Sequence, residues 1–127
     1  MKKIRIIFIM LSLTFLLFVS ASCIAQEKYH PGGPYYYGDF ATYKIPFRPI
    51  EELTPSEAKT RDVYYLAYFN DGGEILSFTK YLKGKIEFSD KYIYDQSGIL
   101  ERRELTKSTG EVIIQYFDKQ GRIIQKK

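Results

Sequence analysis

Apolar and polar residues alternate along much of the second half of the chain, which is the pattern of β-strands that bury one face. In the strand predicted around residues 86–94, the apolar face carries Ile86, Phe88, Tyr92 and Tyr94. The next strand, at 99–105, carries charged residues on both faces and is expected to be partly solvated on each side. By contrast, the unbroken apolar run VYYLAYF at 63–69 predicts a buried strand.

One short pattern occurs three times and predicts β-hairpins. It reads aromatic, Asn or Asp, two spacers, Gly, any residue, then Ile or Leu, and it begins at Phe69, Tyr94 and Phe117. The glycine can adopt a positive φ without a steric clash, and the Asn or Asp side chain can bond to its own backbone two residues on. Further turns are predicted at 83–84 and 108–110. A role in turns explains the repeated Asn or Asp better than calcium binding, because a calcium ion needs several converging oxygen ligands.

The segment at 50–60 is the one helical candidate. Thr54 can cap a helix, Pro55 suits its first position, and Glu57 completes a capping box. The stretch before it, 35–47, is rich in aromatic residues and predicts a strand broken at Gly38, followed by an extended piece between prolines. Two interpretations of these rings stay open, a lid over the sheet or a platform for a sugar or peptide. The platform hypothesis names Tyr35, Tyr36, Tyr37 and Tyr43 as candidate ligand-binding residues.

The N-terminus has the pattern of a secretory signal peptide. Basic residues precede an uncharged apolar run at 6–19, and small residues follow at 20–22. Cleavage after Ala25 would make residues 1–25 the leader. Alternatively, the sequence Ser-Ala-Ser before Cys23 resembles a bacterial lipobox, in which Cys23 is lipidated and the leader is 1–22. Both alternatives predict an extracytoplasmic protein of the periplasm or cell envelope, and in the second it is lipid-anchored.

Composition narrows the function classes. The 19 basic residues exceed the 15 acidic ones by four, but three of the basic residues lie in the leader, so no nucleic-acid partner is expected. Membrane contact is expected only through the lipid. The single cysteine allows no disulfide within one chain. The single histidine, His30, falls in a Pro/Gly-rich linker predicted at 26–34. No catalytic residues, metal site or cofactor are therefore predicted.

The repeated pattern also resembles known hairpin repeats. Residues 92–100, YIYDQSGIL, resemble the YD repeat of bacterial surface and toxin-shell proteins, and residues 117–123 match the core of that repeat. Short MORN-type repeats are a second likeness. Both resemblances imply hairpin structure, and neither implies a ligand.

The arrangement as a whole resembles a small bacterial domain family of unknown function. The features of that family are an aromatic cluster with Tyr-x-Gly, a Pro-containing segment, a short helix and a run beginning Arg-Asp. They correspond here to residues 35–44, 45–49, 52–57 and 61–69. The resemblance covers most of the chain after residue 34 and implies no activity.

Taken together, these patterns predict a mainly all-β domain at 35–127. It is expected to be an antiparallel meander of six or seven strands with one short helix, and the sheet is expected to be strongly twisted or partly curled. The expected function is that of an exported, non-catalytic envelope protein that binds or scaffolds a protein or glycan through its aromatic sheet. An immunity-like factor that neutralises a toxin is the alternative. A small hydrolase with paired carboxylates is the third hypothesis.

Overall fold

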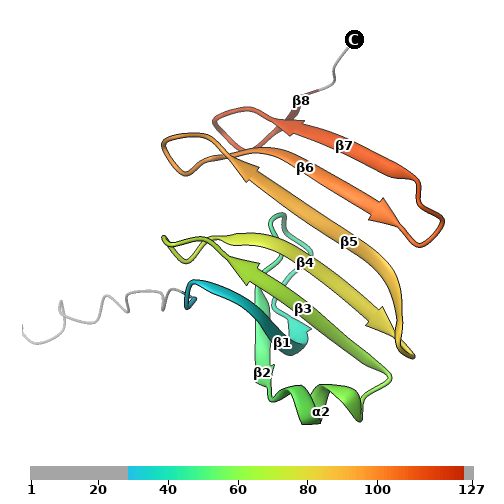
Figure 1. The fold of residues 1–127 in the computed structure, drawn as a ribbon. Coiled ribbons are helices and arrows are strands. Elements are labelled where there is room, and N and C mark those ends of the chain that lie inside the picture. The colour runs from blue at the N-terminus through green and yellow to red at the C-terminus, as the bar shows by residue number, and fades with distance from the viewer. Residues whose placement is uncertain (1–28, 125–127) are drawn as a thin grey trace, which may run out of the picture.

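A single antiparallel sheet of eight strands makes up most of the computed structural model, which describes residues 29–124 (Figure 1). Its strands run in the order β2-β1-β3-β4-β5-β6-β7-β8. The elements are β1 (Gly32–Phe40), β2 (Pro49–Leu53), α2 (Pro55–Lys59), β3 (Val63–Phe69), β4 (Ile75–Leu82), β5 (Lys85–Tyr94), β6 (Leu100–Lys107), β7 (Val112–Phe117) and β8 (Ile123–Ile124).

The strands from β3 to β8 follow one another as a meander, and β1 and β2 extend the sheet on the other side of β3. The short helix α2 connects the edge strand β2 to β3 (Figure 1). These features confirm the predicted antiparallel meander with one short helix. There are eight strands rather than six or seven. The segment read as one helical candidate at 50–60 divides into β2 and α2.

The repeated pattern forms the same turn each time. In each copy the backbone N–H of the Asn or Asp donates to the carbonyl four residues on, at 2.8–2.9 Å. The side-chain oxygen of that residue also accepts the N–H four residues on, at 2.9–3.0 Å. The pivot glycines have φ values of 78°, 83° and 81° at Gly73, Gly98 and Gly121. Positive φ at these sites is why the pattern requires glycine.

The helix α2 begins as its sequence predicts. The Thr54 side chain accepts the backbone N–H of Glu57 at 3.2 Å, and the Thr54 hydroxyl donates to the Glu57 carboxylate at 3.1 Å. The first of these bonds satisfies one of the backbone N–H groups that a helix start leaves unpaired, and Pro55 at the first position has no N–H to satisfy.

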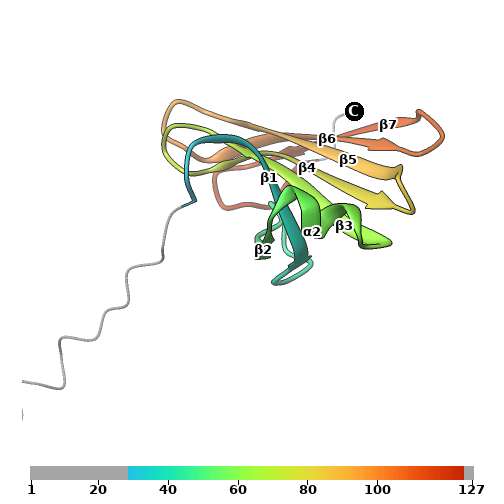
Figure 2. The ribbon, with the colours of Figure 1, turned by 60° about the horizontal axis from the view of Figure 1, so that its bottom comes forward.

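The core is aromatic and lies on one face of the sheet. Residues 41–48 leave the end of β1, cross this face and carry Phe47 onto it, with ring centroids 5.1 Å from Phe78 and 5.0 Å from Phe40. Figure 2 shows β1, β2 and α2 below the layer of β4–β7, so the sheet curls toward this covered face. It does not close, because β2 and β8 remain as its two edges.

Three expectations for the N-terminal part need correction. Residues 35–40 are a strand of the sheet rather than a lid, and 41–48 provide the cover. The strand is not broken at Gly38. A Cβ there would lie 2.6 Å from side-chain atoms of both Glu51 and Arg61, so the glycine leaves room for that ion pair.

The predicted linker at 26–34 also ends earlier than expected. The strand β1 begins at Gly32, because a bulge between Gly32 and Tyr35 absorbs the irregular Gly-Gly-Pro backbone. Before it, the Tyr29 ring stacks on Phe69 with centroids 4.4 Å apart. The predicted leader and Cys23 lie outside the described residues. Within the described part, no helix has the length and apolar character needed to cross a bilayer.

Candidate functional site

The four candidate tyrosines do not form one platform. Side chains alternate along a strand, so Tyr35 and Tyr37 of β1 point to the covered face and Tyr36 points to the opposite one. Tyr43 lies on the covering segment and is 86% exposed. Of the four, the structure therefore brings together only Tyr35 and Tyr37.

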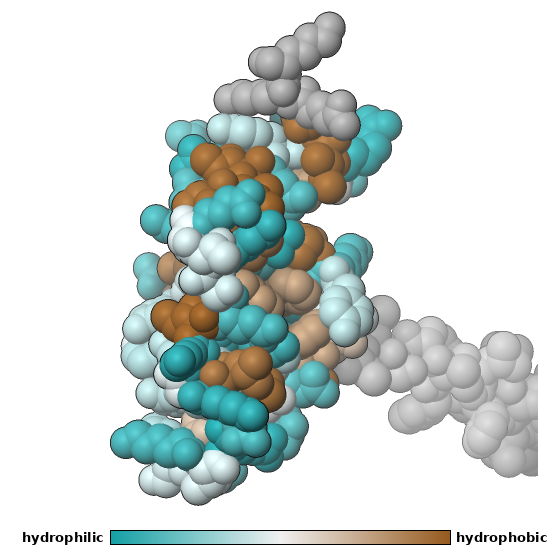
Figure 3. All heavy atoms as spheres, turned by 90° about the vertical axis from the view of Figure 1, so that its right-hand side faces the viewer, coloured by the Kyte–Doolittle hydropathy of each residue, from teal (hydrophilic) through white to brown (hydrophobic). Residues whose placement is uncertain are grey.

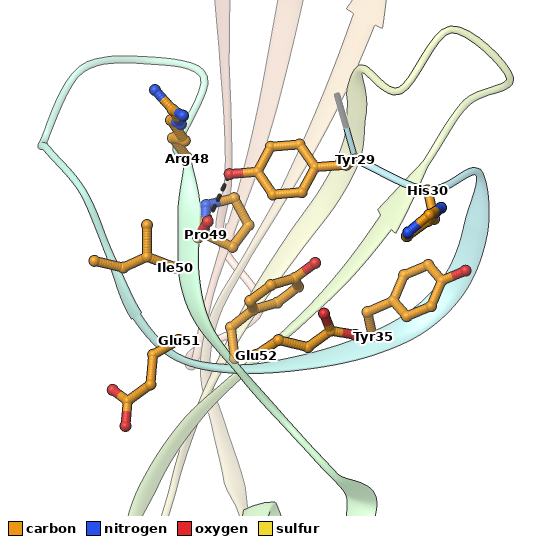
Figure 4. A pocket seen from close by; sticks show the side chains of 9 residues that line it. Tyr29, His30, Tyr35, Arg48, Pro49, Ile50, Glu51 and Glu52 are labelled. Carbon is orange, nitrogen blue, oxygen red and sulfur yellow. Dashed lines mark hydrogen bonds between the residues drawn. The ribbon is translucent and has the colours of Figure 1, made fainter. Parts of the chain in front are cut away.

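These two tyrosines line a pocket of about 340 Å³ at the β2–β1 end of the covered face. The lining consists of Tyr29, His30, Tyr35, Tyr37, Arg48, Pro49, Ile50, Glu51 and Glu52. Figure 4 shows Tyr29, His30, Tyr35 and Glu52 around the central space. Of these, Tyr29 and His30 come from the segment that the sequence assigned to a linker, so sequence reasoning missed them. We call this site the tyrosine pocket.

Hydrogen bonds hold two of the rings in place. The Tyr29 hydroxyl donates to the backbone carbonyl of Pro49 at 2.5 Å, and the Tyr35 hydroxyl donates to that of Pro31 at 2.9 Å. The first bond joins the start of the domain to the edge strand β2 (Figure 4). One wall of the pocket is therefore fixed by a bond between residues 20 apart in sequence, and the other by a bond between residues four apart.

The third ring, Tyr37, presents a hydroxyl that has no hydrogen-bond partner within residues 29–124. The side chain is only 6% exposed and packs edge-on against Tyr29, with centroids 6.2 Å apart. Burial raises the pKa of Tyr37 above its ordinary value, and the nearby Glu52 carboxylate raises it further. The hydroxyl is therefore a neutral donor at physiological pH. The buried side-chain polar atom that lacks a partner among residues 29–124 is Nε of Arg102, not this hydroxyl.

Two side chains of opposite charge, Arg48 and Glu52, also line the tyrosine pocket, and Arg48 interacts with the Tyr29 side chain. In the described chain neither Arg48 nor Glu52 forms an ion pair. Glu51 differs, because its carboxylate binds Arg61 at 2.7 Å and points away from the space between Tyr29 and Glu52 (Figure 4). Although two acidic residues line the pocket, only one carboxylate is directed into it. This arrangement does not favour a hydrolase with paired carboxylates.

His30 also lines the tyrosine pocket and lies beside Tyr35 in Figure 4. Across the described residues no hydrogen bond links His30 to a serine, threonine or acidic side chain. A histidine that acts as a general base needs both a nucleophile and an orienting group within bonding distance. No group of three or more metal-ligating side chains is found in the same part of the chain.

A second polar cluster lies deeper in the core. Asp90 of β5 is fully buried and accepts bonds from Arg103 at 2.8 and 2.9 Å and from the Tyr92 hydroxyl at 2.8 Å. The Tyr92 hydroxyl in turn accepts the backbone N–H of Phe47 at 3.3 Å. We call Asp90, Tyr92 and Arg103 the buried ion-pair cluster. It fastens the covering segment to the sheet and does not line the tyrosine pocket.

The opposite face of the sheet carries a separate row of rings. Tyr64 and Tyr81 stack with centroids 4.9 Å apart, and Tyr36 lies 6.0 Å from Tyr64. Beyond this row, Thr79 and Ser89 are joined by a hydrogen bond of 2.9 Å. Figure 3 shows apolar side chains in separate groups between polar ones on the side of the molecule that it views.

Fold and site together define a small, single-sheet antiparallel β domain with a tyrosine-lined pocket at one end. The chain belongs to a family of unknown function, DUF6156, whose model matches residues 30–126. The match spans every described strand and the helix, and it confirms the resemblance to a domain family of unknown function. No curated protein and no solved structure matches the chain.

Proposed function

We propose that this protein is an exported, non-catalytic binding protein of the bacterial cell envelope, and that the tyrosine pocket is its binding site. The observation that carries the proposal is the convergence of three tyrosine rings, Tyr29, Tyr35 and Tyr37, with the Glu52 side chain on one pocket. The leader-like residues 1–25 support export.

The lining favours binding over catalysis. Rings and a few polar groups that converge on one space are typical of ligand sites, in which apolar walls supply contact and polar groups fix orientation. Catalysis by acid–base chemistry needs a second group held close to the first. Here the Glu51 carboxylate forms an ion pair with Arg61, so Glu52 is the acidic side chain of the pocket lining that remains without one in the described chain.

The test combines location with ligand binding. Fractionation and N-terminal analysis of the mature protein are expected to find it outside the cytoplasm and shortened by the leader. Ring-labelled tyrosine NMR with peptide and saccharide fragments of the envelope is expected to shift the Tyr35 and Tyr37 signals. The shift of the Tyr35 signal should be lost in Tyr37→Phe and kept in Tyr43→Phe, because Tyr43 lies outside the pocket. A cytoplasmic protein, or chemical conversion of the bound fragment, would refute the proposal.

The alternative of an immunity-like factor is supported by the free edge of β7. The strand β8 pairs only with Tyr116 and Phe117, so Val112–Gln115 have no strand partner on that side within residues 29–124. An open edge with exposed apolar side chains can accept a strand from another protein. If this alternative holds, deleting the gene makes cells sensitive to a toxin, and a Pro substitution at Ile114 abolishes protection. Full protection without the gene rules it out.

A further inference from the structure

We propose that the tyrosine pocket binds a primary ammonium group on an alkyl stem, as in a lysine side chain or a free aliphatic amine. This proposal rests on the proposed function and narrows it to a ligand class. It follows from the register of β1 and β2, which places the Glu52 carboxylate among tyrosine rings on one face of the sheet.

The strand pairing sets Glu52 beside two of the rings. Tyr37 of β1 and Glu52 of β2 are directly opposite each other in the antiparallel ladder, so their side chains lie side by side on the same face. Tyr35 is two residues from Tyr37 along β1 and therefore shares that face. Besides burial, which has the larger effect, the Glu52 carboxylate raises the pKa of the Tyr37 hydroxyl, as expected for a negative charge close to it.

The groups on this face suit a donor that carries a positive charge. The Glu52 carboxylate only accepts hydrogen bonds, and the neutral Tyr37 hydroxyl can accept as well as donate. The Tyr35 hydroxyl is already bonded to the Pro31 carbonyl at 2.9 Å, so Tyr35 offers its ring to a ligand. A primary ammonium has three N–H donors, and tyrosine rings attract cations through their negative π faces. An ammonium therefore matches each of these groups.

The Arg48 charge in the lining is directed elsewhere. Arg48 interacts with the Tyr29 side chain, and Figure 4 shows its guanidinium pointing away from the space beside Glu52. His30 lies beside Tyr35, and a neutral imidazole can accept a bond from an ammonium. An anionic ligand in the same space would instead meet the Glu52 carboxylate. The volume of about 340 Å³ lies at the small end of ligand pockets, which favours a slender alkyl stem.

Pentylammonium is the probe that tests this assignment, with binding to the mature protein measured by tyrosine-ring NMR and calorimetry. Glu52→Gln should weaken binding by about 10-fold to 100-fold, because it removes a charged hydrogen bond. Tyr35→Leu should weaken it by about 2-fold to 5-fold, the contribution expected of one cation–π contact at an exposed site. Glu101→Gln is the matched control, because Glu101 is exposed on β6 outside the pocket, and it should leave binding unchanged.

Comparison ligands separate the charge, the N–H donors and the source of the ammonium. Pentanol keeps the stem without the charge, and tetramethylammonium keeps the charge without an N–H group, so each should bind about 10-fold or more weakly. N-acetyl-lysine methylamide carries the ammonium on a peptide unit. Tighter binding of this compound than of pentylammonium assigns the ammonium to a peptide lysine, and weaker binding assigns it to a free amine. Both results support the ammonium class.

The outcomes also distinguish the ligand class from the proposed function. Absence of pentylammonium binding, full binding in Glu52→Gln, or equal binding of pentanol or tetramethylammonium overturns the ligand class. Binding of N-acetylglucosamine in place of pentylammonium also overturns it, while the proposed binding function stands. If pentylammonium binds as expected but the protein resides in the cytoplasm, the envelope function fails and the ligand class stands. Glu52→Gln should keep the thermal stability of the parent, because Glu52 is exposed, so its loss of binding would not reflect unfolding.

Discussion

Removing one member of the buried ion-pair cluster should destabilise the domain more than any surface change. Asp90 is fully buried, and the Arg103 side chain is 12% exposed. In Asp90→Ala the guanidinium keeps its charge and loses both bonds to the carboxylate, and the Tyr92 hydroxyl loses its acceptor. Breaking a buried pair in this way costs about 3–5 kcal/mol. The total stability of a domain this size is roughly 5–15 kcal/mol, so the loss is a large fraction of it.

The double variant provides the sharper measurement. Arg103→Met alone should cost about as much as Asp90→Ala, because it leaves a carboxylate buried with Tyr92 as its only side-chain partner. Asp90→Ala combined with Arg103→Met removes both charges, so the loss should fall well below the sum of the two single losses. Urea unfolding followed by circular dichroism gives the free energies of the cycle.

An exposed pair on a neighbouring part of the sheet is the matched control. Lys107 and Glu111 lie 3.2 Å apart, and their side chains are 46% and 60% exposed. The cycle Lys107→Met with Glu111→Ala should give a coupling energy below about 1 kcal/mol. If the Asp90 and Arg103 losses add to within about 0.5 kcal/mol, the two residues do not act as a unit and the reasoning is wrong.

Three further predictions concern the tyrosines, a turn and the helix. Burial raises the pKa values of Tyr37, Tyr92 and Tyr94 above the ordinary 10.0, so the folded state holds these protons more tightly than the unfolded chain. The free energy of unfolding therefore includes a contribution from these tyrosines that is present below pH 10 and is lost as the pH rises further. The check is an ultraviolet titration of the folded protein. Reversible ionisation of all twelve tyrosines near pH 10 would contradict the prediction. Gly121→Ala should cost about 1–2 kcal/mol in urea unfolding, because φ is 81° while the space around the Cβ is open, and no loss would show that the turn adapts. Thr54→Ala should cost about 1 kcal/mol by the same assay, whereas Thr54→Ser should keep most of the cap.

Local patterns in the sequence were sufficient for the hairpins and the helix. The pivot glycines and their Asn or Asp partners act within five residues of chain, so their geometry follows from spacing alone. The capping box at Thr54 is local in the same sense. Each of these features needs no information about which distant segment lies beside it.

The tyrosine pocket could not be predicted in the same way, because it is assembled from segments whose neighbours are set by the fold. Tyr29 enters it only because β2 lies at the edge of the sheet and offers the Pro49 carbonyl. Alternation along β1 could have separated Tyr36 from Tyr35 and Tyr37 in advance. Alternation also places Asp90 on the apolar face of β5, between Phe88 and Tyr92, and that position was the signal for a buried charge.

The meander has a consequence for how such a chain can change in length. From β5 onward each strand is joined to the next by a short turn and pairs only with its neighbours in sequence. The strands β1 and β2, which carry lining residues of the tyrosine pocket, lie at the opposite end of the sheet (Figure 1). Duplication or loss of one hairpin at the β8 side would therefore change the span of the protein and leave its binding end intact. Evolution, or a protein engineer, could therefore lengthen this sheet one hairpin at a time at its β8 edge.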